Sequence, residues 1–322
     1  MKSILIAKLT SLGDIIFALP MVDDLQRQFP EVQIDWLVDA QFAELPAMHS
    51  GIRRVISVPL RGFKKRTHKA NLQGVFAAVK QLRMEQYDVV LDCHGMIKSA
   101  LLSKAAHADA IIGPPDARLG EAIARYAYDR QVMPDSQLPG TEWYRAFAGL
   151  AMNYDVHDAP SLGLKTPSFT PDWLPTQQPF VLCFHAASKA EKQWPMAYWA
   201  QLLQALEQAG ITAILPWGSE HEHQVAQQIA AASTLAVVPP RMSLSQITSL
   251  IQRADWSIGV DTGLTHLAES LHCHSVALYT QTDAKSYHPD WNVHAYSLGG
   301  GGVIPLPEQV LAILGIAPCR MN

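Results

Sequence analysis

The sequence is poor in cysteine and in charged residues. Four cysteines stand among 322 residues, at Cys93, Cys183, Cys273 and Cys319, with no C-x-x-C pair. This usage is typical of reduced, mostly buried thiols in a cytosolic protein. Charged residues make up 17% of the chain and the net charge is −4, so the overall charge does not favour a nucleic-acid partner.

Long apolar runs are also absent. No stretch approaches the ~18 apolar residues that a membrane span needs. Met1, Lys2 and Ser3 lead directly into an apolar strand, with no separate signal segment before it. We therefore expect a cytoplasmic protein.

Several cofactor and metal motifs are missing. Neither G-x-G-x-x-G nor G-x-x-x-x-G-K-[ST] follows the first strand, so the NAD and P-loop interpretations lose their main support. No two aspartates stand two residues apart, and the 13 histidines form no H-E-x-x-H. We therefore expect no metal and no cofactor. A bound diphosphate would then be neutralised by Lys or Arg and by helix N-termini.

The sequence does show a regular alternation of strand and helix patterns. Hydrophobic residues make up 48% of the chain, which suffices for two buried cores. Short apolar runs predict strands at Ile4–Ala7, Ile34–Val38, Val55–Val58, Val89–Asp92, Ala110–Ile112, Phe180–Phe184, Ala213–Leu215, Leu235–Val238, Ser257–Val260 and Ser275–Tyr279. Helical spacing predicts helices at Leu72–Glu85, Ile97–Ala106, Gly140–Met152, Met196–Ala209, Glu220–Ala232, Leu244–Gln252, Leu264–His272 and Pro307–Leu314. A further helix is predicted between Ile15 and Phe29, with Pro20 kinking it or shifting its start.

This alternation predicts an α/β protein of two Rossmann-like domains. A stretch rich in proline separates the two arrays and predicts a linker at residues 156–179, between domains at 1–155 and 180–322. The last helix could pack back on the N-terminal domain. Two such arrays place a cleft at the carboxyl ends of their strands, where ligands bind in these folds. The Gly299–Gly302 run is a loop without an assigned role.

The segment 259–266 follows a strand and opens a helix. Asp261 or Thr262 can cap that helix, and the free N–H groups of Thr262, Gly263 and Leu264 would face an anion. The alternative is an ordinary capped helix.

Three further loops follow strands. Lys192 lies before a helix that Pro195 can start at its first position, and its ammonium could reach phosphates or simply be solvated. Asp14 could cap its helix or act as a general base. Glu222 could accept hydrogen bonds from ribose hydroxyls or pair with the helix dipole.

Taken together, these segments resemble the ADP-heptose:lipopolysaccharide heptosyltransferases, glycosyltransferase family 9. The resemblance rests on KLTSLGDI at residues 8–15, RVI at 54–56, HGMIKSA at 94–100, KQWP at 192–195, LPWG at 215–218, MSL at 242–244 and VDTGLTHL at 260–267. The chain departs from the family pattern at residues 280–284, where TQTDA replaces a GPTDP-like segment.

The resemblance implies a GT-B fold and an inverting, metal-independent transfer of L-glycero-D-manno-heptose from ADP-heptose. The implied acceptor is the Kdo residue of Kdo₂-lipid A in the lipopolysaccharide inner core. It implies Asp14 as catalytic base and Lys192 as the main phosphate ligand, with the donor bound by the C-terminal domain and the acceptor by the N-terminal domain. The implied donor contacts are Thr10, Ser11, Gly13, Ser188, Lys192, Glu222, Met242, Asp261, Thr262, Gly263, Leu264 and His266.

An anionic acceptor calls for basic residues. Arg61, Lys64 and Lys65 lie in a basic loop, and Lys98 and Arg118 could join them; the alternative is a solvated charged face. Such a patch also favours an anionic membrane surface, so we expect peripheral contact with the cytoplasmic side of the inner membrane.

Other functions remain open at this stage. One alternative is a transferase of the same family that uses another sugar donor or another acceptor. A sugar-nucleotide 2-epimerase would release a free epimer without any acceptor. A nucleotide-binding scaffold would need no base beside its ligand.

Overall fold

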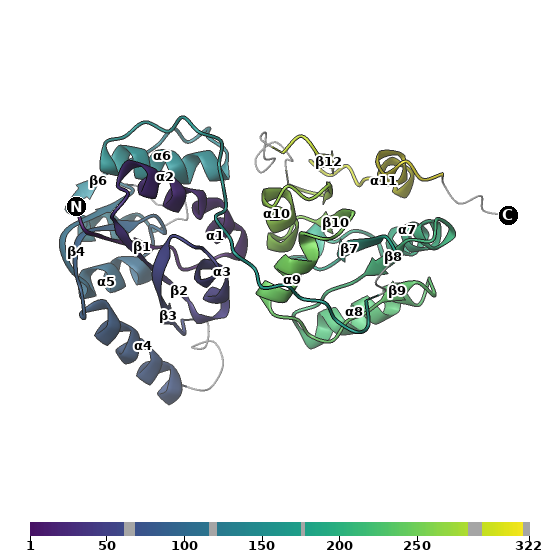
Figure 1. Cartoon of the computed structure of the whole chain (residues 1–322), viewed down its shortest axis with the longest axis horizontal. Helices are drawn as coiled ribbons and strands as arrows, with labels where there is room; N and C mark the ends of the chain where they lie inside the picture. The colour runs from purple at the N-terminus through teal and green to yellow at the C-terminus, as the bar shows by residue number, and fades with distance from the viewer. Residues whose placement is uncertain (61–67, 116–120, 175–177, 283–291, 318–322) are drawn as a thin grey trace. The chain divides into compact units, whose positions relative to one another are not determined.

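The computed structural model describes residues 1–60, 68–115, 121–174, 178–282 and 292–317. The chain forms two compact units, Met1–Lys165 and Thr166–Asn322. Each unit is a parallel β-sheet with helices on its faces (Figure 1). The division falls within residues 156–179, where the sequence is rich in proline.

The N-terminal sheet has six parallel strands in the order β3-β2-β1-β4-β5-β6. The strands are β1 (Ser3–Ala7), β2 (Gln33–Asp39), β3 (Ile52–Val58), β4 (Gln86–Asp92), β5 (His107–Gly113) and β6 (Arg130–Gln131). All five residues of β1 are buried. A continuous apolar run of this kind suits a central strand that is covered on both faces.

Two helical layers cover this sheet (Figure 1). One layer packs together α1 (Leu12–Ala18), α2 (Pro20–Gln28) and α6 (Gly140–Met152). The other contains α4 (His68–Leu82), α5 (Ile97–Ala105) and the 3₁₀ segment η3 (Ala122–Ala127). Ala78, Ala100 and Ala124 of these three elements share one core with Leu5 and Val90 of the sheet. Short segments η1 (Ala40–Phe42) and α3 (Glu44–Ala47) follow β2.

The helix predicted between Ile15 and Phe29 is divided at Leu19. Pro20 is the first residue of α2, where its missing N–H costs no hydrogen bond. The predicted effect of Pro20 is therefore confirmed.

The C-terminal sheet also has six parallel strands, in the order β12-β11-β10-β7-β8-β9. The strands are β7 (Phe180–Phe184), β8 (Thr212–Ile214), β9 (Ala236–Val237), β10 (Trp256–Val260), β11 (Ser275–Tyr279) and β12 (Ala295–Gly299). Counted from its own first strand, each sheet has the order 3-2-1-4-5-6, which is the Rossmann arrangement. The predicted α/β fold with two Rossmann-like units is confirmed.

The C-terminal helices are α7 (Met196–Gln208), α8 (Glu220–Ala230), α9 (Leu244–Ile251), α10 (Gly263–Ser270) and α11 (Pro307–Leu314), with a 3₁₀ segment η4 (Ala190–Lys192). The last helix packs on α7 within this unit, where its Val310 and Leu311 are buried. Pro195 is the N-cap of α7 rather than its first residue, because its ψ of 137° is extended.

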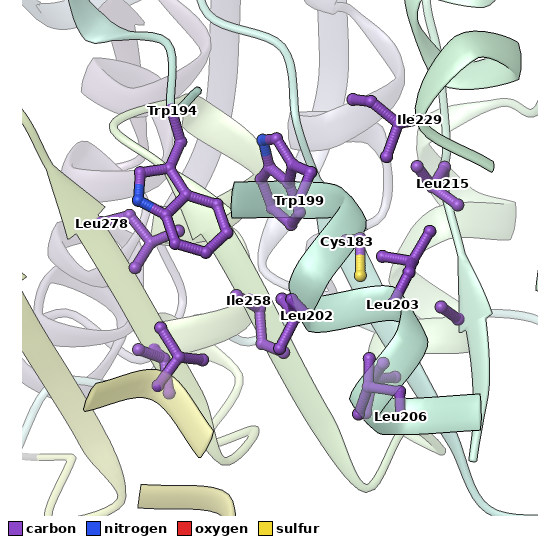
Figure 2. Close-up of a cluster of buried hydrophobic side chains, with 14 of the residues drawn as sticks. Cys183, Trp194, Trp199, Leu202, Leu203, Leu206, Leu215, Ile229, Ile258 and Leu278 are labelled. Carbon is purple, nitrogen blue, oxygen red and sulfur yellow. The ribbon is translucent and has the colours of Figure 1, made fainter. Parts of the chain in front are cut away.

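The core of the C-terminal unit is built on α7 (Figure 2). Trp199, Leu202, Leu203 and Leu206 recur at i, i+3, i+4 and i+7, which places them on one helix face. They pack with residues of the sheet, including Cys183 of β7.

Three cysteines are free and buried: Cys93, Cys183 and Cys273. Burial raises the pKa of the Cys93 and Cys183 thiols to about 12. The same effect raises the pKa of the Cys273 thiol to about 11. Cys319 lies outside the described residues.

Some elements carry too little sequence signal to be predicted. The strand β6 has only two residues, and both are exposed. β12 reads AYSLG and leads into four consecutive glycines, Gly299–Gly302, whose φ angles are all positive. That run is a turn closed by a bridge between Gly300 and Val303. Across the described ranges, the structure contains no helix with the length and apolarity of a membrane span.

Candidate active site

Each sheet reverses its strand order between its first and fourth strands. In open α/β sheets, ligands bind at the carboxyl ends of the strands beside such a reversal. In the N-terminal unit these strands are β1 and β4, and in the C-terminal unit they are β7 and β10. Asp14 follows β1, Lys192 follows β7 and Asp261 follows β10. These three predicted site residues therefore lie at two topologically equivalent positions.

Asp14 is the third residue of α1 and makes a capping box with Ser11. Its Oδ2 accepts hydrogen bonds from the Ser11 amide at 2.9 Å and from the Ser11 hydroxyl at 2.7 Å. Its Oδ1 accepts a hydrogen bond from the Tyr144 hydroxyl at 3.1 Å. The side chain is 32% exposed. Asp14 is thus a helix cap, and it is also an accessible carboxylate.

A buried lysine stands behind this carboxylate. The Lys8 ammonium is fully buried, lies 3.7 Å from Asp14 Oδ1 and sits 4.9 Å from the centroid of the Tyr144 ring. Within the described ranges, its Nζ has no hydrogen-bond acceptor. Burial by itself would raise the pKa of Asp14, but the Lys8 charge and the hydrogen bonds from Ser11 and Tyr144 hold it below its usual value. Asp14 is therefore an anion at neutral pH.

The end of β4 supplies the neighbouring residues. Asp92 accepts hydrogen bonds from the amides of His94 and Gly95, both at 3.1 Å, and so fixes the turn that begins α5. Burial and the nearby Lys8 ammonium lower the pKa of His94 to about 3. His94 is therefore neutral. Lys98 is exposed on α5.

In the C-terminal unit, charged side chains gather around Asp261. Its Oδ2 accepts hydrogen bonds from the Lys192 ammonium and the Thr282 hydroxyl, both at 2.6 Å. Its Oδ1 lies 3.4 Å from Nε2 of His266, whose Nδ1 lies 3.2 Å from Glu269. Burial would raise the pKa of Asp261, but hydrogen bonds from His266, Lys192 and Thr282 hold it far below its usual value.

His266 is buried as a cation between two carboxylates. Burial opposes its charge, yet the hydrogen bonds and charges of Asp261 and Glu269 raise the pKa of His266 to about 9. Lys192 and His266 together balance Asp261 and Glu269 in charge. A phosphate that approaches Lys192 must therefore compete with Asp261 for its ammonium.

The N-terminus of α10 lies beside this charged group. Thr262 is the N-cap and makes no side-chain capping bond. Within the described chain, the backbone amides of Thr262, Gly263 and Leu264 have no hydrogen-bond acceptor. Gly259 allows β10 to approach this helix, because a Cβ there would collide with Thr265 and Phe184. The helix thus begins with unpaired amides, as predicted, and their contact with an anion stays a prediction.

The end of β8 places Glu222 in the first turn of α8. Its carboxylate accepts a hydrogen bond from the Gly218 amide at 2.7 Å, and its carbonyl oxygen lies 3.1 Å from Nε2 of His185. One carboxylate oxygen is thus engaged in holding the turn before α8. Met242 is half-buried just before Ser243, the N-cap of α9.

Comparison with known proteins assigns the family. Residues 75–301 match the profile of glycosyltransferase family 9 (heptosyltransferase). The lipopolysaccharide heptosyltransferase 1 of Salmonella typhimurium is 31% identical over 87% of this chain and 89% of its own length. The chain belongs to glycosyltransferase family 9.

Two solved structures of E. coli heptosyltransferase WaaC are similar to this member of the family. The complex with ADP has a TM-score of 0.86 and 27% identity, and it covers 97% of this chain and 99% of its own. The complex with ADP-2-deoxy-2-fluoro heptose has a TM-score of 0.83 and 28% identity, with the same coverage. The suspected family, the GT-B fold class and the glycosyltransferase activity are thereby confirmed.

The structure brings some of the predicted residues of this family 9 enzyme together in two groups, while Lys98, Glu222 and Met242 belong to neither. In the N-terminal unit, Ser11 contacts Asp14, and Thr10 and Gly13 are its neighbours in the same loop and helix start. Lys192, Asp261 and His266 form one connected group in the C-terminal unit, with Ser188 exposed in the loop that leads to Lys192. Arg61, Lys64, Lys65 and Arg118 lie outside the described residues.

Sequence reasoning missed several members of these groups. Tyr144 contacts Asp14 from 130 positions away, and only the packing of α6 on α1 brings it there. Thr282 belongs to the segment where the chain departs from the family pattern, yet its hydroxyl binds Asp261. Lys8 is the first residue of the KLTSLGDI segment, but the sequence analysis gave it no role. Its position directly after a fully buried strand could have indicated a buried lysine near the site.

Proposed function

We propose that this family 9 enzyme transfers L-glycero-D-manno-heptose from ADP-heptose to the Kdo residue of Kdo₂-lipid A. The observation that carries the proposal is the group of Lys192 and the α10 amides, in a chain that is similar over 97% of its length to a heptosyltransferase solved with an ADP-heptose analogue. A lysine and unpaired amides at a helix N-terminus suit a diphosphate.

The proposed reaction is a single displacement that inverts the anomeric carbon. The Asp14 carboxylate takes the proton of the acceptor hydroxyl as that oxygen attacks. A positioned general base of this kind contributes typically ~10²–10⁴ in rate. The low pKa of Asp14 keeps it ionised, and Lys8 and Tyr144 hold it in place.

The leaving group is ADP, and negative charge grows on its terminal phosphate as the bond breaks. Lys192 and the amides of Thr262, Gly263 and Leu264 would stabilise that charge. Asp261 orients the Lys192 ammonium before the donor arrives. In this proposal the cations and amides replace a metal ion, and the reaction needs no added metal.

The remaining assignments complete the proposal. Glu222 binds the ribose and Met242 contacts the adenine. Arg61, Lys64, Lys65, Lys98 and Arg118 bind the anionic acceptor. The enzyme would then work at the cytoplasmic face of the inner membrane, where a lipid-linked acceptor is presented.

The decisive experiment measures heptose transfer from ADP-heptose to Kdo₂-lipid A, with and without a chelator. We expect transfer in both cases. Asp14→Asn should lower kcat by about 10²-fold or more and leave the affinity for ADP-heptose within about twofold. Asp155→Asn, an exposed carboxylate in the same unit, is the matched control and should behave as wild type.

Each alternative predicts a different outcome. Near-normal turnover by Asp14→Asn would remove Asp14 as the base. Transfer to a different acceptor only would indicate another member of the family. Release of an epimerised sugar from the donor alone would indicate a sugar-nucleotide 2-epimerase.

A further inference from the structure

Large apolar side chains lie exposed on three neighbouring elements of the N-terminal unit. They are Leu72 and Phe76 on α4, Ile97 and Leu101 on α5, and Ile123 and Tyr126 on η3. Their exposed fractions lie between 41% and 77%. α5 packs against both α4 and η3, so the three elements form one layer, here called the outer layer (Figure 1). Contiguous exposed apolar side chains mark an interaction surface.

The outer layer is also basic. Among the side chains that the structure describes, its three elements contain four basic residues and no acidic residue: Lys80, Lys98, Lys104 and Arg125. The layer on the opposite face of the sheet, formed by α1, α2 and α6, has four acidic residues and two arginines. The whole chain carries a net charge of −4. The outer layer is therefore positively charged, although the chain as a whole has a negative net charge.

The apolar and basic side chains share the same helix faces. On α5, Ile97, Lys98, Leu101 and Lys104 are exposed, while Ser99, Ala100, Leu102 and Ser103 are buried. On α4, Leu72, Phe76 and Lys80 follow each other at intervals of four residues and are all exposed. Four-residue steps keep side chains on neighbouring positions of one helix surface.

Two acidic residues of the described chain, Glu121 and Asp129, lie at the edges of this surface. The Glu121 carboxylate accepts a hydrogen bond from the Ile97 amide at 2.7 Å and so satisfies the start of α5. Asp129 lies 3.4 Å from Lys104. Neither carboxylate interrupts the exposed faces of α4 and α5.

Interleaved aliphatic and basic side chains fit the headgroup region of a bilayer. That region offers anionic groups and, a few ångströms deeper, apolar chains. Long lysine side chains can reach headgroups while neighbouring apolar side chains enter the acyl boundary. We propose that the outer layer of α4, α5 and η3 docks on an anionic lipid bilayer. This proposal rests on the proposed function in one respect: the lipid-linked acceptor of that function is held in a membrane, so the enzyme must reach the membrane surface.

The test is cosedimentation with vesicles of phosphatidylcholine, with and without phosphatidylglycerol. Wild type should bind the phosphatidylglycerol vesicles and bind pure phosphatidylcholine at least about tenfold more weakly. Phe76→Ser with Leu101→Ser should weaken binding about tenfold, through lost apolar contact. Lys80→Glu with Lys104→Glu should weaken it at least as much, through charge. Leu150→Ser removes an exposed apolar side chain of α6 and should bind as wild type.

Activity assays separate this proposal from the proposed function. Both double variants should use a water-soluble acceptor without acyl chains as well as wild type does, and lose activity only on a vesicle-borne acceptor. The proposed docking surface is contradicted if wild type does not bind anionic vesicles, or if both double variants bind them as strongly as wild type. It is also contradicted if Leu150→Ser weakens vesicle binding as much as the double variants do. Vesicle binding without sugar transfer to either acceptor would instead contradict the proposed function alone.

Discussion

At the scale of single residues, the two oxygens of Asp14 have different partners. Oδ2 closes the capping box with Ser11, while Oδ1 faces Tyr144 and the buried Lys8 ammonium. The helix cap and the proposed catalytic base are thus compatible in one side chain. In the proposed reaction, the capping bonds would fix the orientation in which the other oxygen meets the acceptor hydroxyl.

Lys8 is one of the groups that keep the proposed base, Asp14, ionised. In the Lys8→Met variant, burial would still raise the pKa of Asp14 but the opposing ammonium would be gone. We expect the acid limb of the kcat/KM–pH profile to move to higher pH, with activity recovering as pH rises. Lys2→Met, an exposed lysine, should leave the profile unchanged. An unmoved limb in Lys8→Met would show that Lys8 does not act on Asp14.

His266 predicts a stability change at alkaline pH. Its pKa is raised from 6.5 to about 9 in the folded protein, so its stabilising charge is fully present below pH 6.5. That contribution is lost as pH rises through about 9. We expect Tm to fall between pH 7 and 10, and His266→Asn to flatten that fall. A variant with the same slope as wild type would contradict the charged, paired histidine.

At the scale of elements, β10 and α10 depend on a close approach at Gly259. A methyl group there would meet the Thr265 hydroxyl, which donates to the Val260 carbonyl at 2.7 Å, and the Phe184 side chain. We expect Gly259→Ala to destabilise the protein by about 1–3 kcal/mol, because an overpacked core must shift. Chemical denaturation measures the change in the free energy of unfolding. An unchanged denaturation midpoint would show that Thr265 and Phe184 move aside without cost.

The elements that the sequence predicted well are those with an unbroken apolar run or a clear helical apolar pattern. β7, β11, α6 and α11 have the predicted bounds, because buried runs and capping residues mark their ends. β12 and β6 were missed, since a short edge strand carries little apolar pattern. In the site, residues next to strand ends were predictable from topology. Tyr144 and Thr282 were not, because only tertiary packing brings them to Asp14 and Asp261.

At the scale of the whole molecule, each sheet holds part of the proposed chemistry at the same topological position. The N-terminal unit contributes the base, and the C-terminal unit contributes the cation and the amides. Charge is also unevenly distributed. The outer layer is basic although the chain as a whole is acidic.

This distribution predicts a strong effect of salt on vesicle binding. The Debye length falls from ~10 Å at 0.1 M to ~3 Å at 1 M salt, so the attraction of the basic layer should be screened. We expect binding to anionic vesicles to weaken steeply over this range, and the residual binding at high salt to depend on Phe76 and Leu101. Binding that is insensitive to salt would contradict the electrostatic part of the contact.

The buried cysteines have a practical consequence. Cys93, Cys183 and Cys273 are enclosed, and their thiols stay protonated at neutral pH, so maleimide reagents should leave them untouched. With Cys319 replaced, one new surface cysteine in each unit would accept a donor and an acceptor dye. Energy transfer between the dyes would then report, in solution and with the three buried thiols retained, whether ADP-heptose draws the two units together.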